Sequence, residues 1–112
     1  MRPNASGLET DIMTTLLYTH GACLDHDPGP MHPENPARLG AVLAALDGAE
    51  FAGLERREAP RAALDQIARV HSATYVEAVL DAIPATGYAG LDPDTIVSPG
   101  SGEAALRAAG AV

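Results

Sequence analysis

The sequence predicts part of an α/β fold built on a parallel sheet. Residues 14–19 form a β-branched and aliphatic run that is typical of a buried strand. Helical patterns follow it, and they outnumber the one or two strands that the sequence supports. The last helix is rich in alanine and shows no stop signal before Val112. Because a parallel sheet needs neighbours on both sides, we expect the chain to be the first part of a larger domain.

The composition fits one small domain and excludes several classes of partner. The chain has 112 residues, of which 46% are apolar. Its net charge is −8, with 15 acidic residues against 7 basic ones, all of them arginine. This balance lacks the basic stripe that phosphate binding requires, so we expect no nucleic-acid partner. No apolar run approaches the roughly 20 residues that span a bilayer, so we expect no membrane insertion.

The N-terminus and the single cysteine indicate the cellular compartment of the protein. Residues 1–13 lack the apolar core of a signal peptide and are predicted to be a flexible leader before the segment 14–112. Cys23 has no second cysteine with which to form an internal disulfide, which fits a reducing environment. We therefore expect a cytoplasmic protein.

Three helices are predicted to begin at a capping side chain: at Asn35-Pro36, at Ser72 and at Ser98-Pro99. The first is expected to end at Asp47-Gly48. Apolar residues at helical spacing give the first two a buried face, formed by Leu39, Val42, Leu43 and Leu46 and by Val76, Val79, Leu80 and Ile83.

The remaining segments carry weaker patterns. Pro60 is expected to open a short helix with Leu64, Ile67 and Ala68 facing inward. The charged run before it, residues 54–59, could form an edge strand. Proline and glycine predict two long loops, at residues 21–34 and 84–94. Loops of such length inside a compact domain are usually functional or disordered.

The first of these loops carries a group of potential metal ligands. His20, Cys23 and His26 are spaced three residues apart, and His32 follows nearby. Imidazole and thiolate groups suit Zn²⁺, so a structural zinc site is one interpretation. The spacing matches no closed zinc motif, however. The alternative is a hydrogen-bonded loop in which the histidine side chains bind backbone carbonyls.

Two further motifs carry charge in unusual surroundings. Arg38 lies in the first turn of its helix, where the helix dipole disfavours a cation. This placement indicates an inward-facing anion or carbonyl partner, unless Arg38 pairs at the surface with Glu34. Asp92 and Asp94 flank Pro93 in a stiff acidic turn, which could accept hydrogen bonds from a ligand or be an ordinary solvated turn.

The ordered set of motifs resembles the start of the histone deacetylase family. The resemblance covers roughly residues 15–112 and is closest to class II and bacterial members, which include deacetylase-like amidohydrolases, acetoin-utilisation proteins and acetylpolyamine amidohydrolases. It is carried by His20-Gly-Ala-Cys23-Leu-Asp-His26, His32-Pro33-Glu34-Asn35-Pro36-Ala37-Arg38-Leu39, Val70-His71-Ser72, Leu91-Asp92-Pro93-Asp94-Thr95 and Ser98-Pro99-Gly100-Ser101.

The resemblance implies an arginase/deacetylase-like three-layer α/β fold, incomplete in this chain, and a catalytic zinc ion that activates water against an acetamide carbonyl. In the family the metal is held by an Asp-x-His pair and a further Asp, and a His-His pair acts in acid–base catalysis. Neither motif occurs in this sequence. We therefore expect the parent protein to be a zinc-dependent hydrolase, and the 112-residue chain alone to be inactive and without a cofactor.

The resemblance also implies roles for individual residues. Arg38 matches an arginine beside the internal channel, through which acetate leaves in relatives. Asp94 matches a rim position that binds the substrate backbone, with Asp92 as a competitor two residues away, and Pro33 is a third candidate substrate-binding residue. His20 and Cys23, with His26 as a possible third ligand, match a structural zinc site of a few relatives.

These implications give one main functional hypothesis and two alternatives. The main hypothesis is the N-terminal segment of a deacetylase acting on acetylated lysine or an acetylpolyamine, to which it supplies rim loops and the channel arginine. One alternative is a non-catalytic interaction module that binds a partner or self-associates through exposed apolar faces. The other is a small metal-binding module that uses His20, Cys23, His26 and His32.

Overall fold

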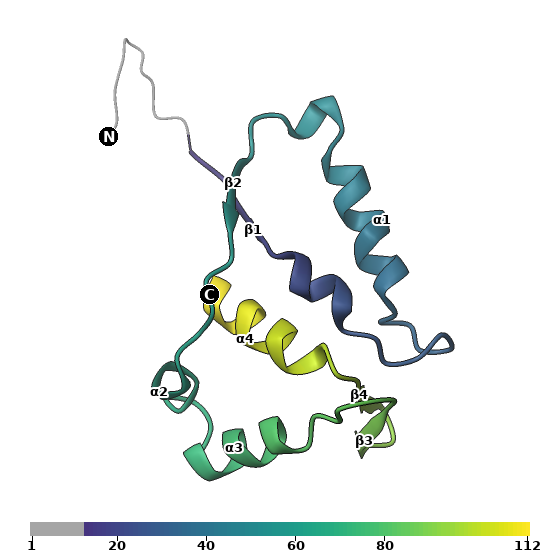
Figure 1. Cartoon of the computed structure of the whole chain (residues 1–112). Coiled ribbons are helices and arrows are strands. Elements are labelled where there is room, and N and C mark those ends of the chain that lie inside the picture. The colour runs from purple at the N-terminus through teal and green to yellow at the C-terminus, as the bar shows by residue number, and fades with distance from the viewer. Residues whose placement is uncertain (1–12) are drawn as a thin grey trace.

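The structure is a computed structural model that describes residues 13–112, so the predicted leader lies outside the described residues except for Met13. Figure 1 shows the arrangement of the elements along the chain. In order they are β1 (Leu16–Thr19), the 3-10 helix η1 (Gly21–Asp25), α1 (Pro36–Leu46), the 3-10 helix η2 (Ala49–Phe51), β2 (Glu55–Glu58), α2 (Leu64–Ile67), α3 (Ala73–Asp81), β3 (Ala89–Asp92), β4 (Thr95–Val97) and α4 (Ser101–Ala111).

β1 and β2 form a parallel pair, in register from Leu16 opposite Glu55 to Thr19 opposite Glu58. The connection between them contains α1, as a parallel crossover requires. The predicted strand and edge strand are therefore both present. The expectation that β1 is buried is wrong within the described residues, since Leu16 is 45% exposed. The physical reason is that this sheet has two strands, so much of the surface of β1 lacks a neighbour.

Both predicted loops contain regular structure. η1 occupies the start of the first loop, where the His20 side chain caps it by accepting a hydrogen bond from the Ala22 N–H at 2.9 Å. The second loop ends in an antiparallel hairpin of β3 and β4, with an irregularity in register between Gly90 and Asp92. The proline and glycine residues of this segment predict a loop rather than a hairpin. The sequence does not indicate the hairpin, because strand pairing depends on contacts between strands rather than on local propensity.

The two clearest helix predictions are confirmed. α1 begins at Pro36, with the Asn35 side chain accepting from the Ala37 N–H at 3.0 Å, and it ends at Leu46. α3 begins after Ser72, whose hydroxyl oxygen accepts from the Tyr75 N–H at 3.1 Å. In both cases a side-chain oxygen satisfies a backbone donor that the helix itself leaves unpaired.

The two other predicted helix starts are wrong. α4 begins at Ser101 after Gly100, because the Ser98 hydroxyl does not cap it but accepts from the Asp27 N–H. α2 begins at Leu64 rather than at Pro60. The N–H of Ala62 donates to the Leu106 carbonyl of α4 at 3.0 Å, which holds the chain before α2 in an extended path.

The inward face predicted for α2 is also wrong in part. Leu64 is 48% exposed and Ala68 is exposed, while Ile67 is half-buried. Because α2 is a single helical turn that packs on α3, it has little surface to bury. The helix therefore covers less of the core than its sequence pattern indicates.

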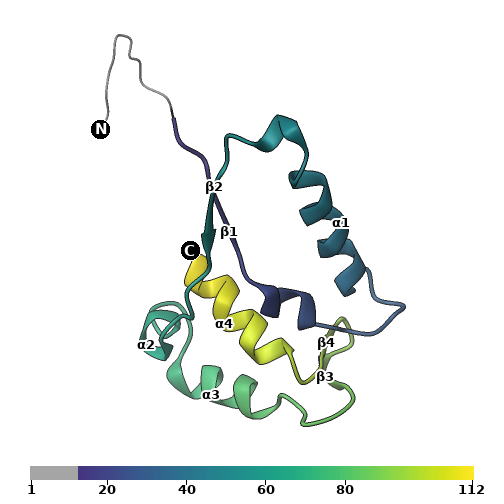
Figure 2. The same ribbon diagram turned by 45° about the horizontal axis from the view of Figure 1, so that its top comes forward.

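The molecule is elongated around a thin core. α4 lies between η1 and α3 in both ribbon views (Figures 1 and 2). The buried apolar residues are Ala59, Ala62, Val76, Val97 and Ala104. The radius of gyration is 17.8 Å, against about 13 Å for a compact domain of this size.

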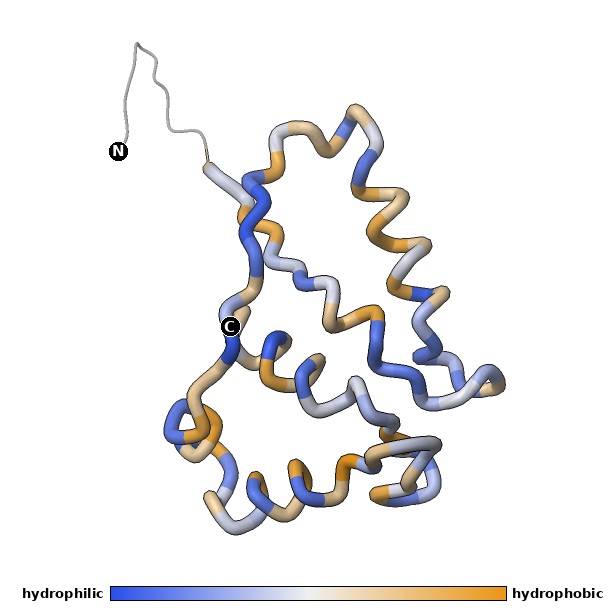
Figure 3. Tube along the Cα trace, viewed as in Figure 1, coloured by the Kyte–Doolittle hydropathy of each residue, from blue (hydrophilic) through white to orange (hydrophobic). Residues whose placement is uncertain are grey.

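Apolar residues recur along α1 and α3 (Figure 3), yet Val42 and Tyr75 on these helices are exposed. In the described part of the chain, therefore, the helices are only partly covered. Among residues 13–112, no helix combines the length and the apolar character needed to cross a membrane.

A carboxylate on α4 joins this helix to the segment before α2. Glu103 accepts hydrogen bonds from Arg61 and from Arg107, the latter at 2.9 Å. Arg107 also donates to the Ala59 carbonyl at 3.1 Å. The hydrogen bond from Arg61, followed by that from Arg107, lowers the pKa of Glu103 below its ordinary value.

This shift predicts an acid-sensitive contribution to stability. A carboxylate with a lowered pKa in the folded state stabilises the fold fully above its unfolded-state pKa, and this contribution is lost as the pH falls through the folded-state value. We expect Glu103→Gln to lower the urea midpoint at pH 7 and to converge with the unmodified chain at acidic pH, where both side chains are neutral. Glu77→Gln, an exposed change on α3, is the control. Parallel pH profiles for Glu103→Gln and the unmodified chain would contradict the prediction.

Candidate functional site

The candidate site lies where residues 26–34, here called the rim loop, meet the acidic turn at residues 92–95. At the far end of this loop, the His32 Nε2–H donates to the Asp94 carbonyl oxygen at 2.9 Å. The other ring nitrogen, Nδ1, accepts from the Glu34 N–H at 3.1 Å. One imidazole therefore joins two segments that are 62 residues apart in the sequence. Pro33, the third candidate substrate-binding residue, is exposed beside this contact.

The near end of the rim loop is fastened by Asp27. Its N–H donates to the Ser98 hydroxyl at 3.2 Å, and its carboxylate accepts from the Tyr88 hydroxyl at 3.2 Å. The second carboxylate oxygen accepts from the Gly29 N–H at 3.0 Å, in a turn where Gly29 adopts a φ of 108°. The negative charge of Asp27 raises the pKa of Tyr88. The loop is thus held at both ends by the β3–β4 region and the start of α4.

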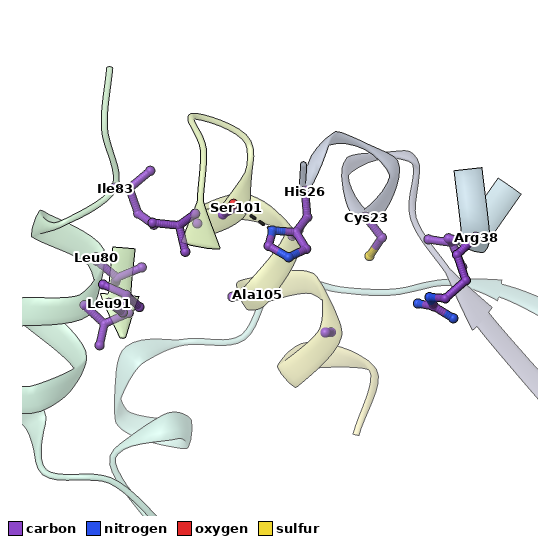
Figure 4. A pocket seen from close by; sticks show the side chains of 14 residues that line it. Cys23, His26, Arg38, Leu80, Ile83, Leu91, Ser101 and Ala105 are labelled. Atoms are coloured by element: carbon purple, nitrogen blue, oxygen red, sulfur yellow. Dashed lines mark hydrogen bonds between the residues drawn. The ribbon is translucent and has the colours of Figure 1, made fainter. Parts of the chain in front are cut away.

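A buried serine adds a third attachment. Ser101, only 5% exposed, has its hydroxyl oxygen 2.7 Å from His26 Nδ1, as Figure 4 shows. The same oxygen accepts from the Ser98 N–H at 2.9 Å. The Ser101 hydroxyl carries one proton and two acceptor lone pairs, so it can serve both neighbours at once.

The structure separates the two carboxylates of the acidic turn. Asp92 accepts from the Asp94 N–H at 2.9 Å, and hydrogen bonding by the Thr95 side chain and then by this N–H lowers the pKa of Asp92. The carboxylate of Asp92 is therefore used within the turn. The Asp94 carboxylate makes no hydrogen bond or ion pair to another side chain or backbone group of residues 13–112. Of the two, Asp94 is the one available to a ligand.

Arg38 lines a cavity of about 390 Å³. Figure 4 shows Arg38 and Cys23 on one side of this cavity and Leu80, Ile83 and Leu91 on the other. Across the described ranges the exposed Arg38 side chain forms neither a salt bridge with Glu34 nor a hydrogen bond to an inward-facing anion or carbonyl, so neither predicted partner is present. The cavity walls are otherwise largely apolar, which leaves the guanidinium group as its main cationic group.

The potential metal ligands do not assemble. His20 Nδ1 accepts from a backbone N–H, and its Nε2 lies 3.5 Å from a Glu58 carboxylate oxygen. His26 is bonded to Ser101, and His32 to the acidic turn. Within residues 13–112 no group of three or more His, Cys, Asp or Glu side chains could hold a metal ion. The three histidines make separate hydrogen-bonding contacts. Of these, only the contact of His32 is to a backbone carbonyl, which is the partner that the alternative interpretation expected for all of them.

Several residues of this region escaped the sequence analysis. Asp27, Tyr88 and Ser101 make the hydrogen bonds that fasten the rim loop, yet their partners lie 61 to 75 residues away. No local spacing signals such a contact. Gly29, with its positive φ, belongs to a residue type that marks a tight turn in sequence.

Comparison with known proteins gives consistent matches. The family described as "Histone deacetylase domain" matches residues 32–112, which is more than half of the chain. An uncharacterised protein of Synechocystis, slr0245, is 37% identical over 100 residues, covering 86% of this chain and 32% of its own length. The crystal structure of the HDA15 HD domain matches with a TM-score of 0.76 and 26% identity, covering 87% of this chain and 29% of that one.

These matches confirm the predicted family and fold class, part of a deacetylase-like α/β fold with a parallel sheet. The chain spans about a third of the length of the relatives it matches. The chain belongs to the histone deacetylase family.

Proposed function

We propose that this chain forms the substrate-binding rim of a zinc-dependent deacetylase that hydrolyses the acetamide of acetylated lysine or an acetylpolyamine. The observation that carries the proposal is the Asp94 carboxylate, which is left unbonded within residues 13–112 on a turn fixed by Asp92 and His32. A carboxylate held in this way can accept hydrogen bonds from N–H groups of a substrate. The net charge of −8 favours the approach of a cationic lysine-rich or polyamine substrate.

We propose that Arg38 acts on the product of the reaction rather than on the substrate. Its side chain lines a largely apolar cavity, where an anion gains from a nearby cation. A carboxylate such as acetate is the product that amide hydrolysis would release. We therefore assign Arg38 to the exit path of this product.

The described residues contribute no zinc site, so the metal and the acid–base groups of the proposed reaction are not assigned to them. The sequence contains neither a His-His nor an Asp-x-His motif. The purified 112-residue chain is accordingly expected not to hydrolyse an acetyl-lysine reporter.

The proposal is tested by grafting the chain into a catalytically active histone deacetylase domain in place of the matching segment. In this graft, Asp94→Ala is expected to raise KM for an acetyl-lysine peptide about tenfold, the effect of losing roughly one charge-assisted hydrogen bond. Asp65→Ala, an exposed change on α2, is the control and is expected to leave KM unchanged. An unchanged KM in Asp94→Ala would refute the proposed role.

A second candidate function is association through exposed apolar surface. Leu16, Leu64 and Tyr75 are 45%, 48% and 56% exposed, and the shape is elongated. These three side chains lie on β1, α2 and α3, where a partner surface could cover them. Light scattering after size-exclusion chromatography tests this function, because a monodisperse monomer at high concentration would count against it.

A further inference from the structure

We infer that His32 is a positioning residue for Asp94, holding the substrate-binding carboxylate at the rim through its imidazole. The inference rests on the proposed function, because it assigns a role to a residue that acts through Asp94. It concerns a different atom, however: the backbone carbonyl of Asp94 rather than its carboxylate. The observation behind it is the His32 Nε2–H to Asp94 oxygen distance of 2.9 Å.

The two contacts of the ring define one state of His32. A carbonyl oxygen only accepts, so Nε2 must carry a proton. A backbone N–H only donates, so Nδ1, which accepts from Glu34, must be without one. The structure therefore selects the neutral Nε2–H tautomer, and an imidazolium would lose the contact with Glu34.

Asp94 is consequently anchored through both of its backbone groups. Its N–H donates to the Asp92 carboxylate at 2.9 Å, and its carbonyl accepts from His32. Of these two contacts, only the one with His32 comes from outside the turn. Pro33 follows His32 directly and restricts its backbone, so that the imidazole is presented from a stiff segment. An anchored backbone restricts the positions that the Asp94 side chain can take. Less conformational entropy is then lost when a substrate binds, which favours binding.

Two substitutions separate the local contact from the long-range one. Asparagine at position 32 can accept from the Glu34 N–H in a local turn, as Asn35 does from Ala37, but it is too short to reach Asp94. Glutamine at this position can place an amide N–H near the position of Nε2 and so restore the donor. His32→Asn should therefore remove the hydrogen bond to the Asp94 carbonyl while keeping the contact with the Glu34 N–H. His32→Gln should retain the hydrogen bond to Asp94.

The contact itself is tested in the 112-residue chain, independently of any activity. We expect nitrogen NMR spectra to show His32 with a protonated Nε2 and an unprotonated Nδ1. His32→Asn should accelerate amide exchange at Asp94 and Thr95 and leave that of Glu34 unchanged, whereas His32→Gln should preserve all three. Exchange at Asp94 that is the same in His32→Asn and in the unmodified chain would overturn the inference.

The effect of His32 on substrate binding is tested in the grafted deacetylase. His32→Asn is expected to raise KM roughly three- to tenfold, the factor associated with one hydrogen bond, with kcat nearly unchanged. His32→Gln is expected to restore KM. If Asp94→Ala raises KM and His32→Asn does not, the positioning role is refuted and the proposed function stands. If neither change affects KM, the substrate-binding role of Asp94 fails, and the positioning role fails with it.

Discussion

Gly110→Ala is expected to destabilise the fold by about 3 kcal/mol, the upper range for forcing an extra carbon into a packed interior. A Cβ at Gly110 would overlap the Pro60 carbonyl oxygen and would lie 2.9 Å from the Ala62 nitrogen. Both neighbours are backbone atoms, so no side chain can rotate away. The chain must separate α4 from the segment before α2, which would also weaken the hydrogen bond from Ala62 to Leu106.

The matched control is Gly102→Ala in the same helix. There the new Cβ would meet the Ile83 side chain at 3.4 Å, an ordinary contact distance. Because alanine favours a helix over glycine by up to about 1 kcal/mol, this change should be neutral or stabilising. Urea unfolding of the two variants measures the difference. Equal effects would show that α4 does not lie against Pro60 as described.

Ser101→Ala is the second change with a large expected effect, a loss of about 2–4 kcal/mol, because it removes the partner of two polar groups at once. The hydroxyl oxygen accepts from the Ser98 N–H and lies 2.7 Å from His26 Nδ1. Ser98 and Ser101 are each only 5% exposed, so water cannot easily replace the lost group. The start of α4 and the near end of the rim loop should loosen together.

Ser72→Ala provides the comparison for this prediction. Its hydroxyl caps α3 by a single exposed hydrogen bond to the Tyr75 N–H. Such a cap contributes about 1 kcal/mol, so the loss should be clearly smaller than for Ser101. Unfolding free energies measured by urea, together with amide exchange at Asp27, distinguish the two. A Ser101→Ala variant no less stable than Ser72→Ala would refute the bridging role.

Local signals in the sequence were sufficient for two of the helices. Asn35 and Ser72 cap α1 and α3 as predicted, because a capping side chain acts on backbone groups two or three residues away. Ser98 carries the same local signal but instead bonds to Asp27, 71 residues earlier. A hydroxyl with a distant partner is no longer available as a cap. The start of α4 could therefore not be predicted from its neighbours alone.

In the candidate site, too, the sequence identified some features and the structure decided others. The sequence identified Asp92 and Asp94 as competing carboxylates two residues apart, and no local pattern could choose between them. The structure distinguishes them because the Asp92 carboxylate is hydrogen-bonded within the turn, whereas the Asp94 carboxylate has no such bond among residues 13–112. Similarly, His20, Cys23 and His26 have types suited to zinc, but the side chains of His20 and His26 are directed into separate hydrogen bonds. Residue type is local, whereas the meeting of ligands depends on the whole path of the chain.

The sequence by itself determined the family, the acidic character, the presence of β1 and the capped starts of α1 and α3. Each of these depends on composition, motif order or interactions between close neighbours. Only the tertiary structure decided the β3–β4 hairpin, the attachments of the rim loop and the anchoring of Asp94 by His32. The hairpin depends on pairing between its two strands, and the other two features depend on hydrogen bonds between segments 61 to 75 residues apart. Such bonds need the fold to bring distant segments together, so no short window of sequence encodes them.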